Sequence, residues 1–217
     1  VVALDKTGTI TSGQPKVTDV VPADGYSERD VMTLAYALEK KSEHPLARAI
    51  VERVQHDTVS APDVQEFQAL PGHGLSAALD GVSLHGGSGT FMQTICEIPA
   101  SLQKQAQQLA EQGKTPLFFS RDNQLVGIVA VADVIKPDSA QAVRELRNMG
   151  MHVVMLTGDN ARTAKAIGAQ AGVDEVVADV LPDGKEAVIR QLRSRGKVAM
   201  VGDGINDTQA LALADVS

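Results

Sequence analysis

The sequence lacks the features of a disulfide-bonded protein, a secreted protein or a membrane-spanning protein. Its one cysteine, Cys96, cannot form an internal disulfide and has no CxxC partner for a metal. We interpret it as a small apolar packing residue of a protein in a reducing compartment. No stretch approaches the roughly 18–20 apolar residues that a membrane-spanning helix needs. No signal peptide is present at the start of the sequence.

The sequence also has little positive charge. The formal net charge is −7, and no basic run is longer than two residues. This balance argues against nucleic acid as the main partner and against a polybasic membrane patch. A length of 217 residues with 43% hydrophobic residues suits one or two compact domains. Because the sequence starts inside an apolar run and stops without a closing helix, we expect it to be a piece of a longer protein.

Short apolar segments alternate with helical segments near the end of the sequence, and a further apolar segment opens it. The predicted strands cover residues 1–4, 153–156, 176–178 and 198–201, and the predicted helices cover residues 137–149, 161–171 and 183–195. This alternation predicts an α/β domain of the Rossmann type, with a parallel sheet and helices on both faces.

The middle of the sequence has a different, α+β character. Predicted helices cover residues 27–39, 45–55 and 101–112, and predicted short strands cover residues 65–69, 75–79, 82–85, 117–120 and 125–131. We therefore predict that an α+β domain with an antiparallel sheet, residues 15–131, is inserted into a parallel-sheet domain formed by residues 1–14 and 132–217. The two links, near Pro15 and residues 133–137, are predicted hinges.

Polar loops follow three of the predicted parallel strands. They begin at Asp5, at Thr157 and at Gly202, and the carboxyl ends of parallel strands are where open α/β sheets bind ligands. An aspartate there can act as a nucleophile toward phosphorus, although an Asp-Lys pair in a loop is by itself more typical of a solvated turn. Asp203 and Asp207 are close enough to repel unless a cation lies between them, and their oxygens suit Mg²⁺. The alternative is a helix N-cap at Asn206 or Asp207.

Two further segments suit an anion. The segment Thr157-Gly158-Asp159-Asn160 offers a hydroxyl and backbone amides at the start of a helix, which suits a phosphate. Lys185 lies in the first turn of its predicted helix, where the helix dipole disfavours a cation, so we expect it to meet an anion. A solvated lysine on the helix surface is the alternative.

Together these motifs resemble the haloacid dehalogenase-like superfamily and, within it, the P-type ATPases. The motifs are Asp5-Lys6-Thr7-Gly8-Thr9, Thr157-Gly158-Asp159 and Gly202-Asp203-Gly204-Ile205-Asn206-Asp207. The resemblance implies Mg²⁺-dependent transfer of the γ-phosphate of ATP to Asp5. It assigns catalysis to Asp5, Lys6, Thr7, Thr157, Lys185 and Asn206, nucleotide contacts to Gly158 and Asp159, and the metal to Asp5, Thr7, Asp203 and Asp207.

Thr7 distinguishes a pump from a phosphatase. Phosphatases of the superfamily place a second aspartate two residues after the nucleophile, and here that position is threonine. Without a carboxylate there, no base is ready to activate water against an aspartyl phosphate, so the intermediate should persist. A soluble phosphatase of the same superfamily and a non-catalytic nucleotide-binding module remain the two alternatives.

The segment Ser42-Glu43-His44-Pro45 resembles the His-Pro motif of heavy-metal-transporting P-type ATPases. The resemblance implies an adenine pocket formed by Glu39, His44, Gly72, Gly74 and Gly86. A capping or core histidine and a glycine turn are the alternatives. The segment 210–216 is more similar to copper-exporting than to zinc-exporting members. In the full-length protein the resemblance implies transmembrane and actuator domains, transported copper, and a position for this region on the cytoplasmic face of the membrane.

Overall fold

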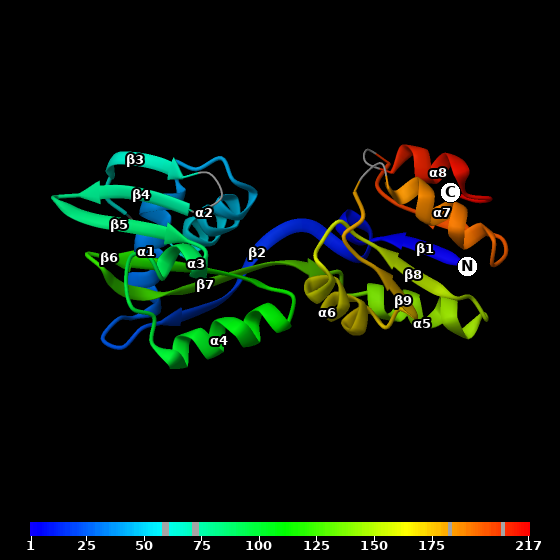
Figure 1. Ribbon diagram of the computed structural model, residues 1–217, viewed down its shortest axis with the longest axis horizontal. Helices are drawn as coiled ribbons and strands as arrows, with labels where there is room; N and C mark the ends of the chain where they lie inside the picture. Colours follow the sequence, from blue (N-terminus) through cyan, green and yellow to red (C-terminus); the bar gives the residue numbers. More distant parts are fainter. Residues whose placement is uncertain (58–60, 71–73, 182–183, 205–206) are drawn as a thin grey trace. The chain divides into compact units, whose positions relative to one another are not determined.

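The chain forms two compact units in the computed structural model, which describes residues 1–57, 61–70, 74–181, 184–204 and 207–217 (Figure 1). One unit comprises Val1–Gln14, Glu111–Gly113 and Asp133–Ser217, and the other comprises Pro15–Ala110 and Lys114–Ala132. Two long strands, β2 (Thr11–Pro22) and β7 (Gln124–Ile135), each contribute residues to both units. None of the helices in the described ranges is long and apolar enough to cross a membrane.

The first unit contains a parallel sheet with strand order β10-β1-β8-β9. Strand β1 (Val2–Asp5) pairs with β8 (Val153–Leu156) on one side and with β10 (Ala199–Val201) on the other. Strand β9 (Glu175–Val177) pairs with β8. The predicted parallel sheet is thus confirmed, and Asp5 stands at the carboxyl end of an inner strand.

Helices cover both faces of this sheet, as the alternation predicted (Figure 1). Side chains alternate along a strand, so Val2 and Leu4 of β1 point to one face and Ala3 to the other. Helices α5 (Ser139–Asn148) and α6 (Ala161–Ala171) pack on the first face. Helices α7 (Lys185–Arg193) and α8 (Thr208–Leu213) pack on the second.

The second unit contains a six-stranded sheet with order β2-β7-β6-β5-β4-β3, in which β3 to β7 pair antiparallel. This confirms the predicted separate antiparallel sheet. Besides β2 and β7, its strands are β3 (Gln65–Leu70), β4 (Gly74–Leu79), β5 (Val82–Gly87) and β6 (Thr115–Arg121). Its helices are α1 (Glu28–Glu39), α2 (Pro45–Asp57), α3 (Gly89–Met92) and α4 (Ala100–Glu111).

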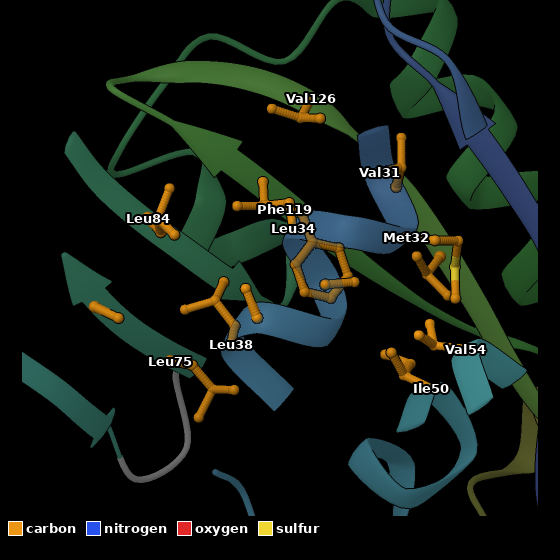
Figure 2. Close-up of a cluster of buried hydrophobic side chains, with 14 of the residues drawn as sticks. Val31, Met32, Leu34, Leu38, Ile50, Val54, Leu75, Leu84, Phe119 and Val126 are labelled. Carbon is orange, nitrogen blue, oxygen red and sulfur yellow. The ribbon is translucent and has the colours of Figure 1, made fainter. Parts of the chain in front are cut away.

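Helix α1 supplies much of the core of the second unit (Figure 2). A capping box between Ser27 and Asp30 fixes its start. Val31, Leu34 and Leu38 recur at helical spacing, so they share one face and pack with Phe119 of β6. Leu75 of β4 belongs to the same hydrophobic core, and it also lines a pocket described below.

Strand β2 and the short helix α3 were missed by the sequence analysis. The segment Thr11–Pro22 carries Gly13, Pro15 and several polar side chains, which hide the alternation of a strand. The residues after Asp5 form a wide turn, Lys6–Ile10, in which Thr7 and Gly8 have non-helical dihedral angles. Gly8 has φ of 76°, a left-handed conformation that favours glycine.

Candidate active site

Asp5, Lys185 and Asp207 meet in the first unit although they are far apart in sequence. Lys185 Nζ lies 2.6 Å from Asp5 Oδ1 and 2.6 Å from Asp207 Oδ1. Asp5 comes from the end of β1, Lys185 from the first turn of α7, and Asp207 from the residue before α8. All three residues are buried, at 5%, 7% and 1% exposure. The ammonium therefore bridges two carboxylates at the carboxyl edge of the parallel sheet.

Burial and ion pairing have opposite effects on the pKa values of the groups in this cluster. Burial raises the pKa of Asp5 above its ordinary value, although the hydrogen bond and charge of Lys185 counteract this rise. Burial alone would lower the pKa of Lys185, but its hydrogen bonds to Asp207 and Asp5 raise it. Lys185 is therefore charged at neutral pH, which explains a cation in the first turn of a helix. With both carboxylates ionised, the cluster carries one net negative charge.

Asp207 points into the cluster and does not cap helix α8. It occupies the N-cap position, but its side chain makes no capping hydrogen bond. A Cβ atom at Gly202 would lie 2.3 Å from Asp207 Oδ2, so only glycine leaves room for this carboxylate. Within the described part of the chain, Asp207 Oδ2 is buried without a hydrogen-bond partner. The Asp207 side chain therefore does not cap helix α8, and the helix-cap alternative does not apply to this residue.

Asp203 lies beside the turn that follows Asp5. A Cβ atom built on Gly8 would be 3.5 Å from Asp203 Oδ2, and the Asp203 residue is exposed. Thr7, in the same turn, is also exposed. Asn206 lies outside the described residues. Among the residues that are described, no three His, Cys, Asp or Glu side chains form a group that could hold a metal ion.

Lys6 links the turn after Asp5 to the loop after β8. Its ammonium lies 3.0 Å from Asp159 Oδ2 and 3.5 Å from Asp133 Oδ2, and its side chain is 8% exposed. The hydroxyl of Thr157, a residue only 2% exposed, accepts a hydrogen bond from the Asp159 amide at 3.1 Å. The Asn160 side chain accepts hydrogen bonds from two amides of the first turn of α6 and so caps this helix.

Asp133 is a site residue that the sequence analysis missed. Its carboxylate accepts hydrogen bonds from the Gly13 amide at 2.9 Å and from the Thr11 hydroxyl, in addition to its contact with Lys6. Nearby, Lys136 Nζ donates to the Gly8 carbonyl at 2.6 Å. These contacts join the turn after Asp5 and the start of β2 to the end of β7 and the residue that follows it. The polar pair Asp133 and Lys136, directly after the apolar run of β7, was the available signal.

The second unit contains a pocket of about 850 Å³ that is lined by Glu39, His44, Gly74 and Gly86. Gly72, the fifth residue expected there, lies outside the described residues. Glu39 is 6% exposed, and burial raises the pKa of its carboxyl to about 7 despite a hydrogen bond with the Ser42 side chain. The pocket combines an apolar wall with one buried carboxyl.

His44 and the two glycines also have structural tasks. His44 Nδ1 accepts a hydrogen bond from the Leu46 amide at 3.2 Å, so the histidine caps helix α2 while lining the pocket. A Cβ atom at Gly86 would lie 2.8 Å from Phe119 Cε1, and one at Gly74 would lie 2.2 Å from the Gly86 carbonyl oxygen. Glycine is therefore required at both positions by packing alone.

Comparison with known proteins places this geometry in a family. Residues 1–215 match the model of the haloacid dehalogenase-like hydrolases, and the chain belongs to that family. The resemblance to heavy-metal P-type ATPases that the motifs predicted is confirmed by more specific similarities. "Copper-transporting ATPase 1" of Rhizobium meliloti (strain 1021) is 44% identical over 217 residues, which are 100% of this chain and 26% of that protein. The chain thus spans about a quarter of the length of this curated relative.

Two solved structures resemble the chain along nearly its whole length. One is a zinc-transporting PIB-type ATPase in the E2.Pi state, with a TM-score of 0.86, 38% identity, and coverage of 98% of this chain and 34% of that chain. The other is the catalytic domain of the CPx-ATPase CopB-B, described for its conformational changes upon nucleotide binding. It has a TM-score of 0.72, 26% identity, and coverage of 100% of this chain and 78% of that one.

The shared ammonium predicts opposite stability effects for two substitutions. Lys185→Met leaves two buried carboxylates without their cation and should lower the free energy of unfolding by about 3–5 kcal/mol. Asp5→Asn removes one of the two negative charges and should raise it by about 1 kcal/mol. Urea denaturation followed by circular dichroism at pH 7 measures both. A Lys185→Met variant as stable as the parent would contradict this account of the cluster.

The effect of Asp5→Asn should depend on pH. In the folded protein the pKa of Asp5 lies above its ordinary value of 3.8, so the group costs stability as the pH rises from that value through the folded pKa. The gain from Asp5→Asn is therefore expected to decrease as the pH falls from 7 toward 3.8. The same denaturation series, repeated at pH 4 to 7, measures this trend.

Proposed function

We propose that this chain is the ATP-hydrolysing core of a P-type heavy-metal pump and that Asp5 accepts the γ-phosphate of ATP. The observation that carries the proposal is the buried cluster of Asp5, Lys185 and Asp207 at the carboxyl edge of the parallel sheet. A carboxylate held at the end of an inner strand is poised for nucleophilic attack on phosphorus. Membership of the haloacid dehalogenase-like hydrolases and the similarity to P-type ATPases support this role.

The chain's own residues supply positioning and charge for the transfer. Lys185 keeps the Asp5 carboxylate oriented through Oδ1 and offsets the negative charge that develops during phosphoryl transfer. Thr157 offers its hydroxyl from the neighbouring loop, and Lys6 ties that loop to the turn after Asp5 through Asp159. Gly158, and Asn206 in the loop before α8, are proposed to support the same site.

The chemistry of the donor groups near Asp5 suits a magnesium ion, although the described side chains do not by themselves form a group of three metal ligands. Asp207 Oδ2 is a buried carboxylate oxygen without a hydrogen-bond partner in the described structure, and Asp203 lies beside the turn at Gly8. Hard oxygen donors of this kind suit Mg²⁺. We propose that Asp5, Asp203, Asp207 and the Thr7 backbone carbonyl hold the ion. When bound, Mg²⁺ would neutralise phosphate charge and so allow a carboxylate to approach.

The pocket of the second unit is the proposed site for the adenine of ATP. Its volume of about 850 Å³ and its apolar wall suit a flat aromatic base. We propose that Glu39, His44, Gly74 and Gly86 contact the base, together with Gly72. Phosphoryl transfer then requires the units to approach each other, and the segments near Pro15 and residues 133–137, where β2 and β7 pass from one unit to the other, are the proposed hinges.

The transported ion is proposed to be copper. The support is the similarity to a copper-transporting relative over the full length of this chain, together with the copper-type segment 210–216. The solved zinc-transporting ATPase is 38% identical, so the fold alone does not separate the two metals. Transmembrane and actuator domains in the full-length protein, with this region on the cytoplasmic face of the membrane, belong to the same proposal. A Cys-Pro-Cys-like apolar segment upstream would support it.

Asp5→Asn should abolish the phosphorylated intermediate. Incubation of the chain with Mg²⁺ and γ-labelled ATP is expected to give acid-stable, hydroxylamine-sensitive label on the parent and none on the variant, because an amide oxygen is a poor nucleophile. Asp24→Asn, at an exposed position, is the control and should label like the parent. Label that survives Asp5→Asn would refute the assignment. ATP binding without label in the parent would instead favour a non-catalytic nucleotide-binding module.

Thr7→Asp should convert a persistent intermediate into a short-lived one. The substitution places a carboxylate two residues after Asp5, at an exposed position, where it can activate water. We expect the aspartyl phosphate to decay about 10²-fold faster, measured as loss of label after a chase with unlabelled ATP. Thr7→Asn has the same size but no basic group, so it should not accelerate the decay. Rapid hydrolysis of p-nitrophenyl phosphate by the parent chain would favour the phosphatase alternative.

A further inference from the structure

Glu39 is a buried carboxyl in a pocket whose wall is otherwise mainly apolar. It sits in the last turn of α1 and is 6% exposed. The apolar side chains that line the pocket are Leu46, Phe67, Ala69, Leu70, Leu75 and Leu117. A base that enters such a pocket closes the remaining access of water to Glu39. Any donor or acceptor left without a partner would then cost binding free energy, so the polar edge of the base must match the donors and acceptors of Glu39.

No cation neutralises Glu39 among the residues that the structure describes. The charged or titratable neighbours that line the pocket are Lys41, Glu43 and His44, and all three are exposed. Lys41 Nζ donates to the Val64 carbonyl at 2.6 Å, and His44 Nδ1 accepts from a backbone amide. Strands β3 to β6 contribute only apolar side chains and glycines to the lining. The Glu39 carboxyl is therefore shielded from water without a compensating charge, and burial raises its pKa to about 7.

The two protonation states of a carboxyl match different purines. The hydrogen-bonding edge of adenine presents a donor, the 6-amino group, beside an acceptor, N1. A protonated carboxyl offers one donor and one acceptor, so it can pair with both atoms. A carboxylate has acceptors only, so it can bond the amino group but faces the N1 lone pair. The corresponding edge of guanine presents two donors, N1–H and the 2-amino group, which match a carboxylate.

We propose that the protonation state of Glu39 selects the purine base: the neutral acid binds adenine, and the carboxylate favours guanine. This inference rests on the proposed nucleotide site and adds to it a proton that is bound together with adenine. Above the pKa of free Glu39, adenine binding must take up one proton, and the affinity for ATP therefore falls as the pH rises. The affinity for GTP changes in the opposite direction below that pKa.

The ratio of two dissociation constants tests the proposal. The chain is titrated calorimetrically with ATP and with GTP between pH 6 and 8.5, without Mg²⁺ so that no phosphoryl transfer occurs. Both nucleotides carry the same triphosphate, so its own titration cancels in the ratio. We expect the preference for ATP over GTP to fall by about tenfold per pH unit. Titrations at pH 8 in buffers of different ionisation enthalpy should show about one more proton taken up with ATP than with GTP.

Glu39→Gln is the matched variant. Its amide offers one donor and one acceptor at every pH, so the variant should keep its preference for ATP and lose the pH dependence. A ratio that does not change with pH in the parent, or a Glu39→Gln variant with the parent's slope, would overturn the proposal.

A second variant separates this inference from the site on which it rests. Ala69 lines the pocket and is exposed, so Ala69→Trp should fill the pocket without disturbing the core. If Ala69→Trp leaves ATP affinity unchanged, the nucleotide binds elsewhere, and both the proposed site and the selection by Glu39 are wrong. If Ala69→Trp weakens binding at least tenfold but the parent ratio is flat, only the selection by Glu39 is wrong.

Discussion

The first unit depends on one buried ammonium shared by two carboxylates. Lys185 bonds Asp5 and Asp207 at equal distances of 2.6 Å, and without it both acids would be buried beside each other uncompensated. This pairing joins the end of β1, the start of α7 and the residue before α8. The same interaction stabilises the packing of these elements and orients the proposed nucleophile. A change to Lys185 would therefore affect both the stability of the unit and the proposed phosphoryl transfer.

Close backbone approach is the second constraint, and it acts in both units. Gly202 leaves room for the Asp207 carboxylate, and Gly86 leaves room for the Phe119 ring. In each case a methyl group would strike a side chain that is itself almost fully buried. Packing alone thus requires glycine at positions where a motif suggests a ligand contact. Loss of activity after substitution of such a glycine would not by itself identify a binding role.

The sequence predicted the parts of the fold that have a regular pattern. Apolar strands followed by helices predicted the parallel sheet, and Lys185 in a first helical turn correctly indicated an anion nearby. Strand β2 was missed because glycine, proline and polar side chains interrupt its alternation. Asp133 was missed because its partners, Thr11, Gly13 and Lys6, are about 120 residues away in sequence, and the local signal, polar residues after the apolar run of β7, does not identify these partners.

Two buried acids in this chain illustrate how one physical effect can serve two purposes. Burial raises the pKa of both Asp5 and Glu39, but only Asp5 has an ammonium that counteracts the rise. A nucleophile toward phosphorus must be ionised, whereas a partner for the donor and acceptor of adenine must keep its proton. Lys185 at one carboxyl favours the ionised form of Asp5, whereas the lack of an equivalent cation at the other within the described residues favours the neutral form of Glu39.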